Sequence, residues 1–198
     1  MNKYLFKIFT LIISLLLIFS LTGCKKAERK ISLVDNPSLS LCDYKLGDLM
    51  GNHSLTDING KTYKFSEVFK EKEVIVLNFW FVNCGPCQME FPYLQTAADA
   101  CADDVIVFAI NPTDDKQKDI EKYATKNNLT LPMIKGEQDW ITAFSLQGFP
   151  TTVVIDRYGK IAFSHIGAVT ESGVFEKIFA YFTADDYEHT VINSINEI

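Results

Sequence analysis

The fold class predicted from this sequence is an α/β sandwich, and the order of buried strands and amphipathic helices predicts it. The nearly continuous apolar run 74–82 is typical of a central strand that is covered on both faces. Strand patterns then alternate with helix patterns, and a hairpin at 151–166 and an amphipathic helix at 170–182 follow at the end. Strands and helices in this order pack as a sheet flanked by helices.

The segment before the central strand carries two local signals. Residues 54–63 predict a hairpin, because Asn59 and Gly60 supply the pair of positive φ angles that a tight two-residue turn needs. Ser66 is expected to cap a short helix that ends at Phe69.

A helix is expected to start near Cys84 and to kink at Pro92, which falls inside its apolar pattern. Further strands are expected at 105–110, 129–134, 151–155 and 160–166, and further helices at 115–127 and 139–146. The pattern of residues 184–198 allows either a helix or a loose tail.

Composition limits the class of function. The 198 residues are 47% hydrophobic and 22% charged, which supports a globular core. The formal net charge of −6 argues against a nucleic-acid-binding protein, because such proteins usually carry a basic face. Five cysteines are too few for a small disulfide-stapled scaffold at this length.

The first 23 residues are expected to be a lipoprotein signal peptide. Lys3 and Lys7 form a basic start, and the apolar run 8–21 is shorter than the roughly 20 residues that span a membrane. The run ends in Leu21-Thr22-Gly23-Cys24, which resembles a bacterial lipobox and implies that lipid is attached to the sulfur of Cys24. An uncleaved signal anchor with an incidental cysteine is the alternative.

The rest of the chain divides into three parts. Residues 24–40 have mixed charges and no periodicity, so they are expected to tether the lipid to a folded domain at 41–183. Residues 184–198 form the tail. A domain anchored outside the cytoplasmic membrane lies in a compartment that permits disulfides.

The chemistry is expected at Cys84-Gly85-Pro86-Cys87. Two cysteines at this spacing could also be half of a zinc site or a coincidence. Here they stand where a buried strand meets a helix, and a helix N-terminus stabilises a thiolate. We therefore expect Cys84 to be the attacking thiolate near the surface and Cys87 to be the shielded thiol that resolves the mixed disulfide.

Segment 80–87 resembles the active site of thioredoxin, and the wider segment 77–94 resembles the TlpA/ResA-like extracytoplasmic branch. The resemblance covers about residues 54–183. It implies a thioredoxin fold, with a central mixed β-sheet flanked by helices, an N-terminal β-hairpin, and a strand and helix inserted between the dithiol and a cis-proline. It also implies a membrane-tethered thiol–disulfide oxidoreductase. Asn83 departs from the pattern, because many relatives have an aromatic residue there.

The resemblance assigns roles to further residues. Gly148-Phe149-Pro150-Thr151 resembles the cis-proline loop that faces the dithiol in the family. Glu90 is expected to assist proton transfer, because Asn78 replaces the strand aspartate of cytoplasmic thioredoxins; an exposed helix carboxylate is the alternative. Trp80 either shields the dithiol or packs in the core. The residues expected to contact the substrate are Trp80, Gly85, Pro86 and Phe149.

The other cysteines and the histidines carry weaker signals. Cys101 falls on the apolar face of the active-site helix and is expected to be a buried small hydrophobic residue. A disulfide between Cys42 and Cys101 stays open, because sequence does not give their distance. No metal or cofactor is expected, since the three histidines show no metal-ligand spacing. They are His53, His165 and His189.

Three alternative functions remain. A copper-delivery chaperone on the same fold would use His165, but such proteins space their cysteines by three residues rather than two. A peroxidase would need a lone cysteine in a loop rich in proline and threonine. A lipid-anchored binding module with an inert dithiol is the non-enzymatic alternative.

The sequence therefore predicts thiol–disulfide exchange on extracytoplasmic protein thiols and disulfides, in the direction of a reductase. The resemblance implies electrons from a CcdA-like membrane thiol donor, and it includes apocytochrome c among the substrates of relatives. A monomer anchored to the outside of the cell membrane through its lipid is expected, with no nucleic-acid partner.

Overall fold

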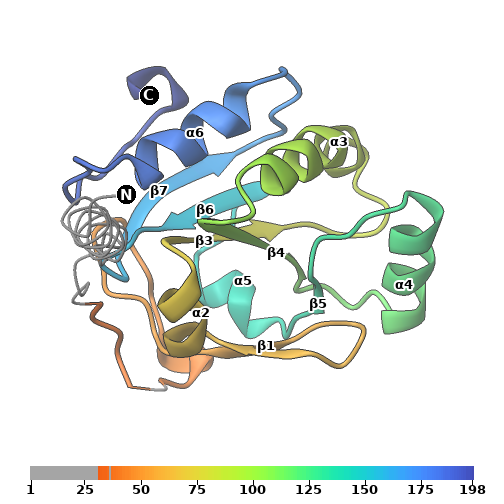
Figure 1. The fold of residues 1–198 in the computed structure, drawn as a ribbon. Helices are drawn as coiled ribbons and strands as arrows, with labels where there is room; N and C mark the ends of the chain where they lie inside the picture. The colour runs from red at the N-terminus through yellow and green to blue at the C-terminus, as the bar shows by residue number, and fades with distance from the viewer. Residues whose placement is uncertain (1–30, 36) are drawn as a thin grey trace, which may run out of the picture. The chain divides into compact units, whose positions relative to one another are not determined.

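The computed structural model describes residues 31–35 and 37–198 (Figure 1). The predicted signal peptide at 1–23, the lipid site Cys24 and the first part of the predicted tether lie outside the described residues. None of the helices within the described ranges is long and apolar enough to cross a membrane.

A five-stranded mixed sheet forms the centre, in the order β5-β4-β3-β6-β7. Its strands are β3 (Val74–Phe79), β4 (Val105–Asn111), β5 (Met133–Lys135), β6 (Thr151–Ile155) and β7 (Ile161–Ile166). Strand β3 pairs in parallel with β4 and antiparallel with β6, and all of its side chains are buried. This arrangement confirms the predicted thioredoxin-type sheet, with β5 and α5 (Asp139–Ala143) as the inserted strand and helix.

Helices cover both faces of the sheet (Figure 1). Helices α3 (Gly85–Ala100) and α6 (Val174–Thr183) lie on one face, and α2 (Phe65–Glu71) and α5 lie on the other. The two faces have separate hydrophobic cores, because successive side chains of β3 point in opposite directions. Val74 and Val76 belong to the α3 side, which also receives α4 (Gln117–Lys126), while Ile75 and Leu77 belong to the α2 side.

The predicted N-terminal hairpin is present as β1 (Ser54–Thr56) and β2 (Thr62–Lys64), but its turn is longer than predicted. The pair Asp57 and Lys61 is still hydrogen-bonded, with the Asp57 N–H donating to the Lys61 carbonyl over 2.9 Å. Residues 58–60 therefore lie inside this hydrogen-bonded pair, and of these three only Gly60 has a positive φ, of 84°. The Asp57 carboxylate accepts the N–H groups of Asn59 and Lys61, which stabilises this wider turn.

Helix α2 starts one residue earlier than Ser66, so the predicted Ser66 cap is wrong. Its N-cap is Lys64, and the Ser66 N–H donates instead to the side-chain oxygen of Asn52 over 2.9 Å. Asn52, which is distant in sequence, thus satisfies one N–H of the first helical turn, and Ser66 does not occupy the N-cap position.

Other features also differ from the prediction, since β5 (Met133–Lys135) starts later than its predicted range and α5 (Asp139–Ala143) ends earlier. Strand β3 ends at Phe79, because the chain turns before Cys84 to begin α3. Helix α6 begins at Val174, because Gly173 before it is left-handed, with φ 82°. Helix α3 continues through Pro92 without interruption.

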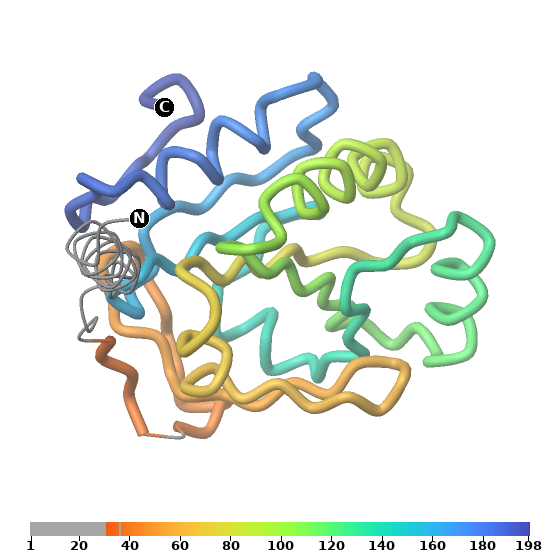
Figure 2. Tube along the Cα trace, in the orientation of Figure 1, coloured from red at the N-terminus to blue at the C-terminus, as the bar shows by residue number. Residues whose placement is uncertain are grey.

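The segments before and after the domain lie against it. Val34 lies in the region predicted to be a tether, and it forms a β-bridge with Gly51. In the tail, Tyr187 and Ile192 are buried, and Ile192 bridges to Phe163 of β7. The trace in Figure 2 shows the tail returning beside α6, and a short 3-10 turn, η2 (Ile195–Glu197), ends it.

Candidate active site

The dithiol occupies the start of α3, where the sequence places it. Cys84 is the N-cap of the helix, and its sulfur accepts the N–H of Cys87 over 3.1 Å. The two cysteines are joined in a disulfide, with Cα atoms 5.3 Å apart. A helix N-terminus has free N–H groups and a partial positive charge, so a thiolate at Cys84 is stabilised there once the disulfide is reduced.

Both sulfur-bearing side chains are buried in the disulfide form. Cys84 is 3% exposed and Cys87 1% exposed, so Cys84 is less accessible than predicted. Its side chain turns inward, because it bonds to Cys87 and caps the helix. Gly85 and Pro86 are exposed and form the surface above the bond.

The proline loop lies at the same end of the sheet as the dithiol. The Phe149–Pro150 bond is cis, as predicted. Thr151, the next residue, pairs with Phe79 of β3, so Pro150 lies level with the chain that leads into the active-site turn. The ring of Phe149 contacts that of Phe81 edge-on, with centroids 5.6 Å apart.

Glu90 is buried, with 1% of its surface exposed, so the alternative of an exposed helix carboxylate is wrong. Asn78 donates its side-chain N–H to one carboxyl oxygen over 2.7 Å, and the backbone N–H of Val169 donates to the other over 2.8 Å. Burial raises the pKa of Glu90 to about 7, although these two hydrogen bonds oppose the shift. The carboxyl group therefore exchanges a proton near neutral pH, one helical turn after Cys87.

Trp80 is fully buried. Its ring contacts Phe91 edge-on, with centroids 5.0 Å apart, and lies 5.2 Å from the ring of Tyr123. It shares this core with both active-site cysteines. The structure favours core packing for Trp80, because a side chain with no exposed surface does not reach a substrate.

Asp115 is a site residue that sequence analysis missed. Its carboxylate accepts the N–H of Val82, two residues before Cys84, over 2.7 Å, and the side chain of Asn111 donates to the same oxygen over 2.9 Å. Burial alone would raise the pKa of Asp115, but the hydrogen bonds from Asn111, Val82 and Thr113 hold it below its usual value. Asp115 follows β4, which lies parallel to β3. The carboxyl ends of parallel strands meet at the same edge of a sheet, so this topology could have placed Asp115 near the dithiol.

Cys42 and Cys101 are both free, so the disulfide that the sequence left open does not form. Cys101 is the C-cap of α3 and is half-buried rather than buried. The ring of His165 stacks on Phe163. Across the described ranges, no three His, Cys, Asp or Glu side chains cluster as metal ligands would.

The fold and this dithiol define a thioredoxin-fold thiol–disulfide oxidoreductase. Residues 46–164 match the AhpC/TSA family, and the chain belongs to that family. It is 32% identical to the thiol-disulfide oxidoreductase ResA of Geobacillus thermodenitrificans over 135 residues, which are 67% of this chain and 70% of that protein. It is 28% identical to the thioredoxin-like protein YneN of Bacillus subtilis over 139 residues, which are 69% of this chain and 75% of YneN.

The solved structures agree on the fold. StoA from Bacillus subtilis superposes with a TM-score of 0.54 at 23% identity, covering 64% of this chain and 92% of that one. The protein is thus a ResA-like thiol–disulfide oxidoreductase of the thioredoxin type.

Proposed function

We propose that the protein is a membrane-anchored reductase of disulfides in extracytoplasmic proteins. The observation that carries the chemistry is the position of Cys84 at the N-cap of α3, with its sulfur accepting the Cys87 N–H. In the reduced state this donor stabilises a Cys84 thiolate, which is the species that attacks a disulfide.

The exchange proceeds in two steps. The Cys84 thiolate attacks one sulfur of the substrate disulfide, forms a mixed disulfide, and releases the other substrate sulfur as a thiolate. Cys87 then loses its proton and attacks the sulfur of Cys84, which releases the second substrate thiolate and closes the Cys84–Cys87 disulfide. Two electrons pass to the substrate, and a donor dithiol restores the protein by the reverse exchange.

In the second step, Glu90 is the residue that accepts the proton of Cys87. Its pKa of about 7 lets it accept a proton from Cys87 in its charged form and return a proton to a leaving thiolate in its neutral form. Its negative charge also raises the pKa of a nearby thiol, which opposes the helix terminus. This effect supports the direction of a reductase, because a dithiol whose thiolate is less stabilised is a stronger reductant.

Equilibration with reference redox couples tests the direction. The reduced and oxidised fractions are measured by alkylation and mass spectrometry in buffers of defined potential. We expect a potential near the roughly −270 mV of thioredoxin. A potential above about −180 mV, the value of protein disulfide isomerase, would mean that the protein acts as an oxidant or isomerase instead.

The anchor and the partners are tested in cells. The lipobox motif at Cys24 supports a lipid anchor, and an anchored reductase needs electrons from across the membrane, for which a CcdA-like thiol donor is the proposed source. Cys24→Ala should remove lipid labelling and shift the protein out of the membrane fraction. Cys87→Ser should trap substrates as mixed disulfides on Cys84, and Cys84→Ser is the matched control that should trap none.

A further inference from the structure

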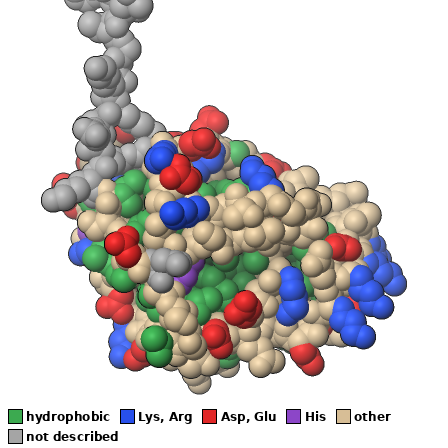
Figure 3. Space-filling view, turned by 90° about the horizontal axis from the view of Figure 1, so that it is seen from below, with side chains coloured by type: hydrophobic (Ala, Val, Ile, Leu, Met, Phe, Trp, Pro, Cys, Tyr) green, Lys and Arg blue, Asp and Glu red, His purple; other side chains and the backbone are tan. Residues whose placement is uncertain are grey.

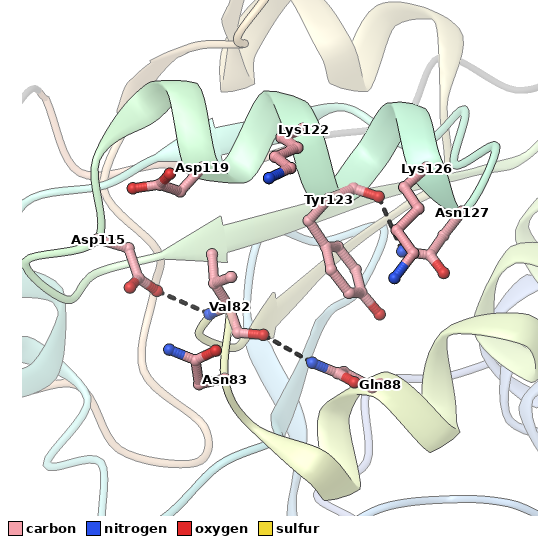
Figure 4. Close-up of a pocket in the computed structure, with 9 residues that line it drawn as sticks. All are labelled: Val82, Asn83, Gln88, Asp115, Asp119, Lys122, Tyr123, Lys126 and Asn127. Atoms are coloured by element: carbon pink, nitrogen blue, oxygen red, sulfur yellow. Dashed lines mark hydrogen bonds between the residues drawn. The ribbon is translucent and has the colours of Figure 1, made fainter.

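A groove of about 390 Å³ opens beside the active-site loop, between the start of α3 and helix α4 (Figure 4). Asn83 forms part of the wall of this groove and directly precedes Cys84 in sequence. The groove therefore begins one residue before the attacking cysteine. The other lining residues are Val82, Gln88, Asp115, Asp119, Lys122, Tyr123, Lys126 and Asn127.

Charge is divided between the ends of the groove (Figure 4). Asp115 and Asp119 lie near the start of α4. The Asp115 carboxylate already accepts hydrogen bonds from the Val82 N–H and from the Asn111 side chain. Lys122 and Lys126 stand further along the same helix, and both are exposed. Within residues 31–35 and 37–198 neither lysine side chain forms an ion pair or a hydrogen bond, so both ammonium groups are free to receive an anion.

Tyr123 gives the groove a third donor and fixes its wall. The ring packs on Trp80 and Phe91, in the core that also contains both active-site cysteines. Its hydroxyl makes no hydrogen bond to any described residue, and burial raises the pKa of Tyr123, so the phenol stays protonated and able to donate. Two ammonium groups and one phenol therefore face the groove without a partner among the residues that the structure describes.

This basic end contrasts with the chain as a whole, whose formal net charge is −6. Helix α4 repeats lysine at every fourth position, at 118, 122 and 126, which places these side chains along one face. Figure 3 shows basic side chains gathered at the edge of the molecule where α4 lies in Figure 1.

We infer that the groove binds the polypeptide segment next to the target cysteine of the substrate, and that Lys122 and Lys126 select segments carrying Asp or Glu. The inference rests on the proposed reductase function, since it names the substrate class of the same dithiol. A carboxylate is the ligand that complements two free amines and a phenol donor, and such complementarity fixes the orientation of a partner and suppresses the wrong ones. The groove is at the small end of the range for binding sites, which suits a short side-chain segment rather than a folded domain.

Symmetric disulfide dimers of a short cysteine peptide test the selection. One peptide has two Glu residues on each side of the cysteine, and the matched peptide has Gln at these four positions. The full chain, reduced and kept in detergent at about 0.15 M salt, should reduce the Glu dimer about threefold to tenfold faster than the Gln dimer, after each rate is divided by the rate with dithiothreitol. The net charge of −6 acts in the opposite direction, so general charge attraction does not produce this preference.

The variant Lys122→Gln/Lys126→Gln should abolish the preference. Lys64→Gln/Lys177→Gln removes the same charge from exposed lysines on other elements, outside the groove, and should keep the preference. A wild-type ratio of one or less overturns the inference, and so does a preference that survives in Lys122→Gln/Lys126→Gln.

A binding measurement separates this inference from the proposed function. The Glu peptide with serine in place of cysteine is titrated into the oxidised protein, and backbone amide shifts are followed by NMR. Shifts confined to α4 and the 82–88 segment support binding in the groove. If these shifts occur but no peptide dimer is reduced, only the proposed reductase function is contradicted. Equal shifts with the Gln peptide overturn the selection of acidic segments. Shifts that depend on protein concentration alone report a second copy of the chain and overturn the groove assignment.

Discussion

Two buried carboxyl groups stand at opposite ends of β6, and their surroundings differ. Asp156 follows the strand and is 0% exposed. It accepts the N–H groups of Tyr158 and Lys160 at one oxygen, and at the other it contacts the Tyr187 hydroxyl at 3.0 Å and a ring nitrogen of His189 at 2.6 Å. Each oxygen thus has two partners.

Glu90 lies near the other end of the strand, where Asn78 pairs with Thr152. It is 1% exposed, and it has only one donor for each oxygen, both of them neutral. A charge buried with few partners is costly, and this cost raises the pKa of Glu90 to about 7.

The difference separates a carboxylate whose acceptor capacity is filled from one whose proton stays exchangeable near neutral pH. Asp156 closes the β6–β7 turn and holds the tail through Tyr187 and His189, so all of its acceptor capacity is used for structure. Glu90 keeps an exchangeable proton beside the dithiol because its site leaves the charge only half satisfied.

The largest expected effect follows from removing Asp156. Asp156→Ala leaves buried donors on both the turn and the tail without an acceptor, so the free energy of unfolding should fall by about 3–5 kcal/mol. Urea unfolding of the oxidised protein measures the loss. Asp186→Ala, an exposed carboxylate of the same tail, is the control and should change stability by less than about 0.5 kcal/mol. Equal losses in the two variants would contradict the structural role of Asp156.

A smaller effect is expected in the pH dependence of stability. Since the folded pKa of Glu90, about 7, lies above its ordinary value of 4.5, its protonated form favours the folded state. Its contribution is complete below about pH 4.5 and is lost as the pH rises to about 7, with a size on the order of 3 kcal/mol. Unfolding of the oxidised protein at pH 5 and pH 8 should therefore show a steeper decline in wild type than in Glu90→Gln. Parallel declines would mean that the pKa of Glu90 is ordinary.

These two carboxyl groups also show what sequence could and could not predict. The alternation of strands and helices and the start of a helix near Cys84 depend on local patterns and were predicted correctly, and the resemblance to the thioredoxin family correctly implied the mixed sheet and the cis bond at Pro150. The environment of Glu90 was not predictable in full, because one of its two donors, Val169, is 79 residues away. Asn78 was identified only as a missing acid, whereas the structure shows that it donates to Glu90.

Two of the mispredicted or undecided features, the Ser66 cap and the tail, have the same origin. Ser66 carried a local capping signal, but its N–H is satisfied by Asn52, 14 residues earlier. The tail has no clear pattern of its own, and its position depends on Asp156, which lies 33 residues before His189. Contacts between distant segments decided each of these features, and a single sequence does not state them.

The third expected effect concerns catalysis by Glu90. Glu90→Gln should leave the fold intact and slow disulfide exchange near pH 7 by about tenfold, because the amide neither accepts nor supplies the proton. The rate of thiol alkylation against pH should also change shape, since in wild type the carboxyl and the cysteines titrate as a coupled group. Alkylation with iodoacetamide across pH 5–9, with the site identified by mass spectrometry, measures both. Superimposable profiles would show that Glu90 does not act on the dithiol.

The smallest expected effect comes from the hydrogen bond between Asn78 and Glu90, which is 2.7 Å long and stabilises the ionised carboxylate. Asn78→Ala removes this donor and leaves only the Val169 N–H, so the pKa of Glu90 should rise further, by about one unit or less. The carboxyl carbon resonance of Glu90, followed by NMR against pH and assigned with Glu90→Gln, measures the change. Thr152 also accepts a hydrogen bond from Asn78, at 3.1 Å, so Thr152→Val is a control that perturbs Asn78 without deleting the donor to Glu90. If the pKa rises as much in Thr152→Val as in Asn78→Ala, general loosening of the core, rather than this hydrogen bond, sets the proton affinity of Glu90.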